Sequence, residues 1–229
     1  MALGAPSAIL VHMNLREFEN GEYYHIYNRG NDGRALFNER YDLDRFLLSM
    51  KLFNTKDSPG SVYEQSFNED KTYRAELVEF IAYCLNPNHF HFLVQQKREG
   101  GISLFMQRLG GYVTYYNLRY KRKGGLLQGK FKAKLVDDND YLLHLSAYVN
   151  LNARVHKLGA PSAKLSQSSW KEYVDPKFLK RNRLCKPDII LNQFASIKEY
   201  ENFCEESLEL MLNAKEEAKE LKQLALEDF

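Results

Sequence analysis

Hydrophobic and polar residues alternate with two different periods along the chain, and each period predicts one kind of element. Runs rich in β-branched and aromatic residues predict four strands, at residues 22–29, 77–85, 89–96 and 129–136. Apolar residues spaced three and four apart predict three helices, at residues 42–53, 103–121 and 141–156. The order of strand, helix, hairpin, helix, strand and helix predicts an α+β fold, in which helices pack on an antiparallel sheet.

Short polar segments separate these elements. Residues 86–88 (Asn-Pro-Asn) lie between the second and third strands and predict a tight hairpin turn. Ser103 is the predicted N-cap of the helix that follows Gly100. The strand at 129–136 alternates basic and apolar residues, so we expect one of its faces to be exposed and positively charged.

Pattern and composition divide the chain into three parts. Residues 1–20 are expected to be an N-terminal extension that can be disordered, because regular patterning begins only after them. Residues 21–160 contain all the predicted strands and are expected to form the main domain. Residues 161–229 are expected to be an appendage that packs on this domain. It begins with loop-like stretches at 168–173 and 176–187 and continues as an acidic helical segment from Ser196.

Composition narrows the class of protein. Hydrophobic residues make up 44% of the chain and charged residues 27%, which is typical of globular proteins and excludes a disordered tail. No uncharged apolar stretch is long enough to span a bilayer, and no basic residue precedes the apolar start, so we expect a cytoplasmic protein without membrane contact. Cys84, Cys185 and Cys204 lie far apart and lack CxxC spacing, which predicts buried reduced thiols and no thiolate zinc site.

Charge is unevenly distributed along a chain whose formal net charge is +2. No acidic residue lies between residues 100 and 136, whereas residues 199–229 contain ten acidic residues and only three lysines. A basic segment with interleaved tyrosines suits a polyanion, because cations neutralise phosphates and aromatic rings stack on bases. The alternative is a solvated helix face. The residues predicted to contact such a polyanion are Arg108, Arg119, Lys121, Arg122, Lys123, Lys130, Lys132 and Lys134.

His89 and His91 form an H-x-H pair in the third predicted strand. Side chains two apart in a strand point to the same side, so the two imidazoles are close enough to share a metal ion, while Phe90 and Phe92 face the core. The pair is not specific by itself, because histidine is also a common partly buried core residue. A metal site here needs a third ligand.

The predicted helix at 141–156 offers candidates for that ligand. Residues four apart lie above one another on a helix, so His144, Tyr148 and Asn152 form one polar line. A tyrosine and an amide one turn apart could reach the same ion, with His144 as possible support. The alternative is that Tyr148 is an ordinary boundary residue of an amphipathic helix.

Four ordered motifs resemble those of the single-tyrosine HUH transposases. Among these enzymes, which include the insertion-sequence transposases, the motifs look most like those of the REP-associated tyrosine transposases. The motifs are the segments Tyr24-His-Ile-Tyr-Asn-Arg-Gly30, Asn86-Pro-Asn-His-Phe-His-Phe-Leu93, Gln128-Gly-Lys-Phe-Lys132 and Tyr141-Leu-Leu-His-Leu-Ser-Ala-Tyr-Val-Asn-Leu-Asn152. The resemblance extends from about residue 22 to residue 159 and implies a ferredoxin-like fold.

The resemblance also implies a role for single residues. His89 and His91 match the family's metal-binding pair, Tyr148 its nucleophile, and Asn152 the polar residue that completes the metal site. Two positions depart from the family. Asn152 stands where the insertion-sequence branch has glutamine, but either amide offers an oxygen. Leu127 stands where relatives often have tryptophan, which would alter a stacking contact with DNA.

The implied activity is metal-dependent cleavage and rejoining of single-stranded DNA through a 5′-phosphotyrosine. Imidazole ligands alone would suggest zinc, but the family uses Mg²⁺ or Mn²⁺, and amide and phosphate oxygens fit these harder ions. The implied partners are DNA hairpins or REP-like repeats, and a homodimer is possible because some relatives form one. Two alternatives are a catalytically silent DNA-binding protein derived from such a transposase and a metal-dependent hydrolase unrelated to DNA.

Overall fold

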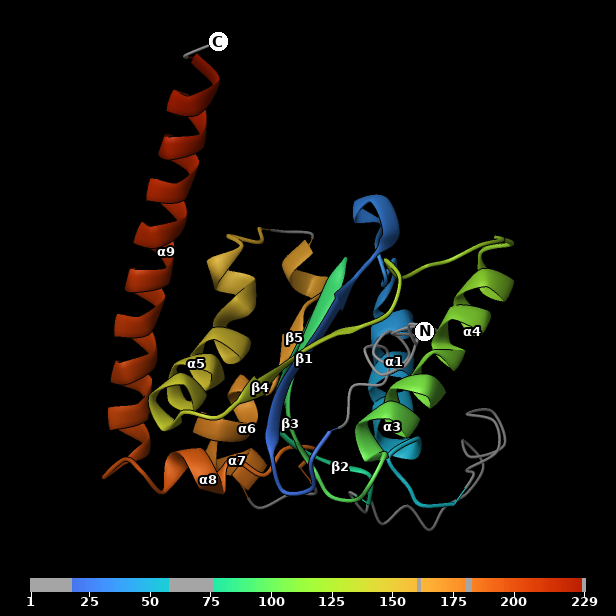
Figure 1. The fold of residues 1–229 in the computed structure, drawn as a ribbon, viewed down its shortest axis with the longest axis horizontal. Coiled ribbons are helices and arrows are strands. Elements are labelled where there is room, and N and C mark those ends of the chain that lie inside the picture. Colours follow the sequence, from blue (N-terminus) through green and yellow to red (C-terminus); the bar gives the residue numbers. More distant parts are fainter. Residues whose placement is uncertain (1–17, 58–75, 160–161, 180–182, 228–229) are drawn as a thin grey trace, which may run out of the picture.

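The computed structural model describes residues 18–57, 76–159, 162–179 and 183–227. In this part of the chain a sheet of five strands lies between two layers of helices (Figure 1). The predicted N-terminal extension falls outside the described residues apart from residues 18–20. None of the described helices is long and apolar enough to cross a membrane.

The sheet confirms the predicted fold class. Its strands are β1 (Tyr23–Arg29), β2 (Val78–Asn86), β3 (His89–Gln96), β4 (Lys132–Val136) and β5 (Gln167–Ser168). Their order is β4-β1-β3-β2-β5, and every neighbouring pair is antiparallel. The first four strands and the helices between them follow the ferredoxin-like order. β2 and β3 form the predicted hairpin, because Asn86 pairs with His89 across a two-residue turn.

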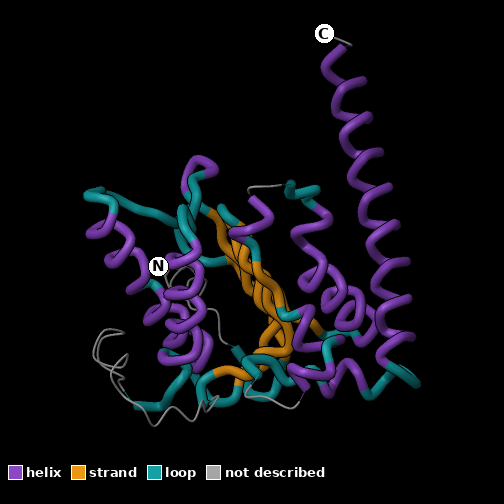
Figure 2. The backbone as a smooth tube through the Cα atoms, turned by 180° about the vertical axis from the view of Figure 1, so that it is seen from behind, coloured by secondary structure: helices purple, strands orange, loops and turns teal. Residues whose placement is uncertain are grey.

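Helices cover both faces of the sheet, as the view from behind also shows (Figure 2). One face is covered by α1 (Arg40–Leu52), α3 (Gly101–Leu109) and α4 (Gly111–Arg119). The other face is covered by α5 (Asn139–Val155), α6 (Trp170–Val174) and α9 (Ile197–Glu227), the last of which extends past the sheet. The short helices are η2 (Asn31–Gly33), η3 (Ser162–Leu165), α7 (Pro176–Leu179) and α8 (Asp188–Leu191).

The prediction of one helix over residues 103–121 is wrong in two details. The helix begins at Gly101, because Gly100 adopts a left-handed conformation with φ 66° and serves as the N-cap in place of Ser103. It is also divided into α3 and α4 at Gly110, where the Val113 amide bonds to the Gly110 carbonyl only three residues back. Glycine has low helix propensity, and the Gly110-Gly111 pair accounts for a break at this point.

An aromatic core fills the space between the sheet and the α1, α3 and α4 layer. Phe80, Phe92 and Phe105 are fully buried and contact one another edge to face, with ring centroids 5.4 to 6.5 Å apart. Phe90 stacks on Phe92 at 4.6 Å. Burial of such rings is the main stabilising contribution on this face.

The segment after residue 160 is more structured than predicted. Residues 168–173, expected to be loop, form the end of β5 and most of α6. Tyr173 and Tyr200 stack on each other at 5.2 Å and are fully buried between the sheet, α5 and α9. The predicted helical segment is confirmed as α9. All three cysteines are buried and free, as expected.

Candidate active site

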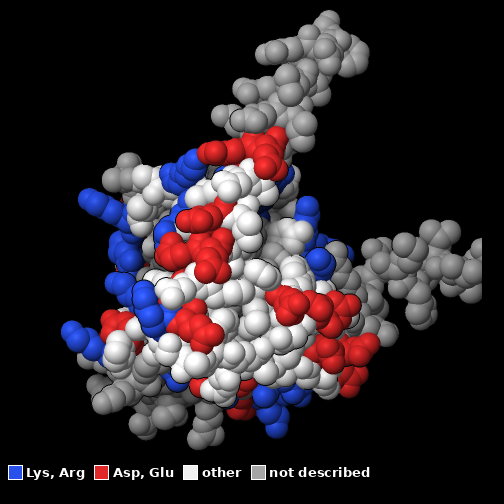
Figure 3. Space-filling view, turned by 90° about the vertical axis from the view of Figure 1, so that its left-hand side faces the viewer, with Lys and Arg blue, Asp and Glu red and all other residues white. Residues whose placement is uncertain are grey.

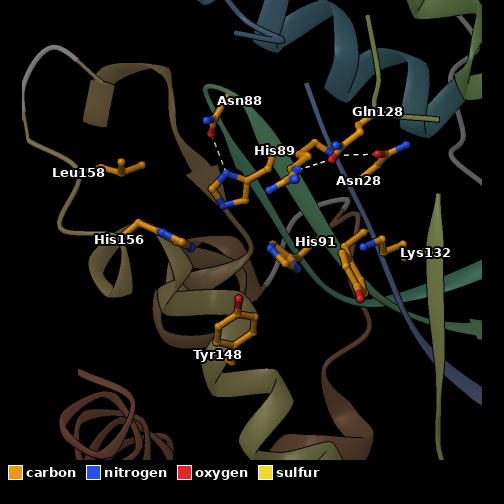
Figure 4. Close-up of a pocket in the computed structure, with 11 residues that line it drawn as sticks. Asn28, Asn88, His89, His91, Gln128, Lys132, Tyr148, His156 and Leu158 are labelled. Carbon is orange, nitrogen blue, oxygen red and sulfur yellow. Dashed lines mark hydrogen bonds between the residues drawn. The ribbon is translucent and has the colours of Figure 1, made fainter. Parts of the chain in front are cut away.

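A pocket of about 510 Å³ opens where β1, β3 and the C-terminal half of α5 meet (Figure 4). It is lined by Tyr27, Asn28, Arg29, Asn88, His89, His91, Gln128, Lys132, Tyr148, His156 and Leu158. All four segments singled out in the sequence contribute to this lining. The pocket is therefore the place where the predicted chemistry can occur.

The alternation of β3 places the histidine pair at the pocket. His89 and His91 project from the α5 side of the sheet, with ring centroids 5.4 Å apart, whereas Phe90 and Phe92 are buried in the aromatic core. The predicted geometry of the pair is therefore present. His91 is buried, and His89 is partly exposed to the pocket.

Helix α5 positions the tyrosine and the amide. Its N-terminus is capped by Asp138, whose carboxylate accepts a hydrogen bond from the Tyr141 amide at 2.7 Å. Tyr148, two turns later, places its ring edge-on to His91 at 5.3 Å, and its hydroxyl points into the space between His156 and His91 (Figure 4). Tyrosine and histidines thus come from the same chain. Asn152, one turn further, reaches His89.

The hydrogen bonds of His89 leave two acceptors facing each other. Its Nδ1 lies 2.7 Å from Asn88 Oδ1, so this nitrogen donates, and its Nε2 accepts from Asn86 Nδ2 at 2.9 Å. The same Nε2 lone pair faces Asn152 Oδ1 at 2.9 Å. Two lone pairs at this separation repel each other, and a cation bound by both would remove the repulsion.

This donor set fits a hard divalent ion. Neighbouring ligands of an octahedral ion with bonds of about 2.0–2.1 Å lie about 3 Å apart, close to the separation of His89 Nε2 and Asn152 Oδ1. Among the described residues no group of three or more His, Cys, Asp or Glu side chains could hold a metal, and the Asn152 amide oxygen is the further protein oxygen that faces His89. His91 contributes the second imidazole.

Asn152 is held in place at an energetic cost. The side chain is fully buried, and its Nδ2 has no hydrogen-bond partner within the described part of the chain. An unpaired buried donor costs about 1–3 kcal/mol. Asn86 Nδ2 donates to Asn152 Oδ1 at 2.7 Å and so fixes the oxygen toward His89. A fold that accepts this cost to orient one oxygen is typical of a functional site.

Burial keeps the imidazoles neutral, which is the form that binds metals. Burial lowers the pKa of His91 to about 2, with smaller contributions from its three histidine neighbours. Burial and then the charge of Lys134 lower the pKa of His25 to about 4. The pKa of His89 is also lowered, chiefly by burial. Each ring is therefore uncharged at neutral pH and keeps one unprotonated nitrogen that can act as a ligand.

Burial has the opposite effect on the tyrosine. It raises the pKa of the Tyr148 hydroxyl above its ordinary 10.0. The hydroxyl is protonated at neutral pH. A reaction that uses it as a nucleophile must therefore make the phosphate more electrophilic and remove the proton as the bond forms.

Three residues of the site were missed by the sequence predictions. His25 on β1 shares a hydrogen bond with His91 Nδ1 at 2.9 Å and orients that ring. Asn86 orients both His89 and Asn152. His156 places its ring 4.8 Å from His89. Only His156 had a usable signal, since it continues the four-residue spacing of His144, Tyr148 and Asn152.

The predicted DNA-binding residues do not form one surface. Lys132 lines the pocket, and Lys134 lies over the Tyr141 ring at 4.2 Å on the same face. Arg108 and Arg119 lie in the opposite layer, where Arg108 donates to the Thr55 carbonyl and Arg119 forms an ion pair with Glu39 at 3.0 Å. The other four, Lys121, Arg122, Lys123 and Lys130, lie at the end of α4 and in the segment before β4.

His144 lies on α5 as expected but turns toward α9. Its Nδ1 is 3.1 Å from Ser207 Oγ, and its ring packs on Phe203. Support of the site by His144 stays a prediction.

The side of the molecule that α9 forms carries acidic groups across its middle, with lysine and arginine gathered along one margin (Figure 3).

Comparisons with known proteins bear on the same segments. Residues 62–152 match the model of a family described as "Transposase IS200 like". This match contains His89, His91, Tyr148 and Asn152. No curated protein gives a significant match. A solved structure titled "Structure of the REP associates tyrosine transposase bound to a REP hairpin" is 13% identical, with a TM-score of 0.45, over 72% of this chain and 86% of that chain.

Proposed function

We propose that the protein cleaves and rejoins single-stranded DNA, because residues 62–152 match the model of an IS200-like transposase family. The observation that carries the proposal is the position of Tyr148. Its ring lies 5.3 Å from that of His91, inside a pocket that also contains His89 and the basic residues Arg29 and Lys132. A nucleophile, a metal-ligand pair and positive charge meet at one point.

In the proposed reaction the Tyr148 oxygen attacks the phosphorus of a backbone phosphate. The bond between phosphorus and the 3′ oxygen breaks, the phosphate stays on Tyr148 as a 5′-phosphotyrosine, and the phenol proton is balanced by protonation of the released 3′ oxygen. Because the phosphotyrosine keeps the bond energy, a second 3′-hydroxyl can reverse the step and join two strands without ATP.

His89, His91 and Asn152 would hold a divalent ion, Mg²⁺ or Mn²⁺. When bound, this ion supplies Lewis-acid chemistry, withdrawing charge from the phosphate oxygens. The chain's own contribution is to keep both imidazoles neutral, to orient them through His25 and Asn86, and to fix the tyrosine on a capped helix.

The partners we propose are single-stranded DNA hairpins or repeat elements. The basic residues predicted from the sequence supply phosphate contacts from more than one side of the molecule, with Lys132 and Lys134 nearest the site. Because Tyr148 faces the histidines of its own chain, a monomer would have a complete site. A homodimer stays a prediction that the site does not require.

The test is capture of the covalent intermediate. Protein is incubated with Mn²⁺ and hairpin oligonucleotides taken from the repeats that flank the gene, and a denaturant-resistant adduct is expected on Tyr148. Tyr148→Phe should lose the adduct and keep DNA binding. Tyr141→Phe, on the same helix two turns earlier, is the matched control and should keep both.

Two further results separate the alternatives. His89→Ala combined with His91→Ala should abolish the adduct but leave most of the affinity, because affinity comes mainly from phosphate contacts. Binding of the hairpins without any adduct would support the catalytically silent reading instead. An adduct on a tyrosine other than Tyr148 would refute the site assignment.

A further inference from the structure

Two of the four sequence motifs contribute the pocket side chains Arg29 and Gln128, which have no assigned part in the reaction described so far. The structure joins these two motifs at the pocket. The segment 24–30 supplies β1, and the segment 128–132 leads into β4. Gly30 and Leu127 form an antiparallel bridge, and the Gln128 amide donates to the Arg29 carbonyl at 2.8 Å. The two segments together form the wall of the pocket that lies across from Tyr148 and His156 (Figure 4).

Strand register places Arg29 directly beside the metal-ligand pair. Arg29 is the cross-strand partner of His89, as Tyr27 is of His91. Directly opposed residues of an antiparallel pair project to the same face, with Cβ atoms about 4.5–5.5 Å apart. Arg29 therefore leaves the sheet on the side of the histidines and reaches into the same pocket.

The Gln128 side chain fixes the direction of the Arg29 guanidinium. Arg29 Nε donates to Gln128 Oε1, and the backbones of the two residues are joined by the hydrogen bond from the Gln128 amide to the Arg29 carbonyl. Neither Arg29 nor Lys132 forms an ion pair in the described part of the chain, although both line the pocket. Lys132 lies 6.0 Å from the centre of the Tyr27 ring, next to His91.

The wall thus presents an oriented guanidinium and a second cation, and neither forms an ion pair with an acidic side chain in the described part of the chain. A guanidinium held through Nε keeps its two terminal nitrogens for a bidentate contact with phosphate. The scissile phosphate must lie near Tyr148, on the other side of the histidines. An extended strand that passes over the histidines brings a neighbouring phosphate toward this wall.

We propose that Arg29, with Lys132 beside it, binds a backbone phosphate next to the one that Tyr148 attacks, and that Gln128 is the positioning residue for Arg29. This inference rests on the proposed function, because it takes the strand in the pocket to be the one cleaved. It assigns these side chains to the alignment of the strand, whereas the histidines and Tyr148 act on the reacting phosphate.

The test measures whether the contribution of Arg29 to DNA affinity depends on one particular phosphate of the DNA. Each phosphate near the cleavage site is replaced in turn by a neutral methylphosphonate, and binding is measured with Tyr148→Phe protein, which cannot cleave. One position should lose about ten-fold or more in affinity, as expected for a charge-assisted contact. In the same protein with Arg29→Ala, that position should cost clearly less, because only Lys132 is then left to contact the phosphate.

Variants of Gln128 separate positioning from simple folding. Gln128→Ala should reduce the coupling between Arg29 and that phosphate. Added to Arg29→Ala it should cost nothing further, because Gln128 acts through Arg29. Arg29→Lys should keep part of the affinity but lose the bidentate contact. Arg34→Ala, a nearby arginine that does not line the pocket, is the matched control and should leave every position unchanged.

Two results would overturn the inference. One is a methylphosphonate cost that is the same with and without Arg29. The other is a loss in Arg29→Ala that depends on which base is present and not on phosphate charge, which would make Arg29 a base-reading residue. Adduct formation with Tyr148 intact is measured in parallel. Its absence in all variants would reject the proposed function and leave the binding result to be judged on its own.

Discussion

The two faces of the sheet differ in how they combine apolar and polar side chains. The face toward α1, α3 and α4 is rich in phenylalanine and tyrosine rings, whereas the face toward α5 combines a mostly aliphatic core with buried histidine, asparagine and serine. Strand β3 contributes to both, because His89 and His91 alternate with Phe90 and Phe92. Strand β3 therefore contributes to the hydrophobic core on one side of the sheet and to the pocket on the other.

Most of the polar groups buried on the α5 face are hydrogen-bonded to one another, the described exception being Asn152 Nδ2. Asn150 donates to Tyr200 Oη at 3.0 Å and accepts from Ser169 Oγ at 2.6 Å. These partners come from α6 and α9, after residue 160. The C-terminal segment therefore stabilises the helix that carries Tyr148, while the aromatic face stabilises the sheet itself.

The largest expected effect on stability lies on the aromatic face. Phe92→Ala should lower the free energy of unfolding by about 3–5 kcal/mol, because it removes a fully buried ring and leaves a cavity. His91→Ala, at the adjacent position on the other face, should lose adduct formation with a much smaller change in stability. Urea denaturation followed by circular dichroism measures the stability of both variants, and the adduct assay measures the loss of activity in His91→Ala. Equal destabilisation by the two changes would contradict the division of the faces.

The next effect tests the orientation of the metal ligands. Asn86→Leu should cost about 1–3 kcal/mol, because it leaves Asn152 Oδ1 and its neighbour His89 without their donor. It should also weaken Mn²⁺ binding by about 10–100-fold, the usual effect of removing a group that orients ligands. Titration calorimetry with Mn²⁺ measures the second effect. Unchanged Mn²⁺ affinity would mean that Asn86 only supports the fold.

A smaller effect is expected where α9 meets α5. Tyr200→Phe removes one hydroxyl that accepts from Asn150 and lies 3.2 Å from Ser146 Oγ, and should cost about 1 kcal/mol. Because these residues lie on the helix of Tyr148, the rate of adduct formation should fall as well. Tyr173→Phe, whose hydroxyl donates to the Ile81 carbonyl, is a control of similar stability cost that should leave the rate unchanged.

The smallest effect concerns the exposed ion pair between α5 and α9. Arg154 makes two contacts with Glu205, at 2.6 and 2.7 Å, and their hydrogen bonds lower the pKa of Glu205 below its ordinary 4.5. Both side chains are about half exposed, so Glu205→Gln should cost less than about 1 kcal/mol. A lowered carboxyl pKa contributes stability above pH 4.5 that is lost in acid. The difference between wild type and Glu205→Gln in thermal melts should therefore shrink as pH falls below 4.5, and a constant difference would exclude the ion pair as its cause.

Local periodicity in the sequence was enough to predict most of the strands and helices and the placing of the histidine pair, Tyr148 and Asn152 on them. Alternation in β3 separated the histidines from the phenylalanines, and four-residue spacing on α5 placed Tyr148 and Asn152 on one line. These predictions succeeded because strand and helix periods are local properties of the backbone. The break at Gly110 and the folding of residues 168–173 were missed, because caps and short elements depend on what packs against them.

Only the tertiary structure decided which distant residues complete the site. His25 and Arg29 are useful to the histidine pair only through the register of β1 on β3, and Gln128 meets Arg29 only because the segment before β4 crosses the end of β1. Asn86 lies three residues from His89 in sequence, yet its role depends on Asn152 of α5. Such pairings join segments that are far apart along the chain, so the hydrophobic and polar pattern within one segment cannot predict them.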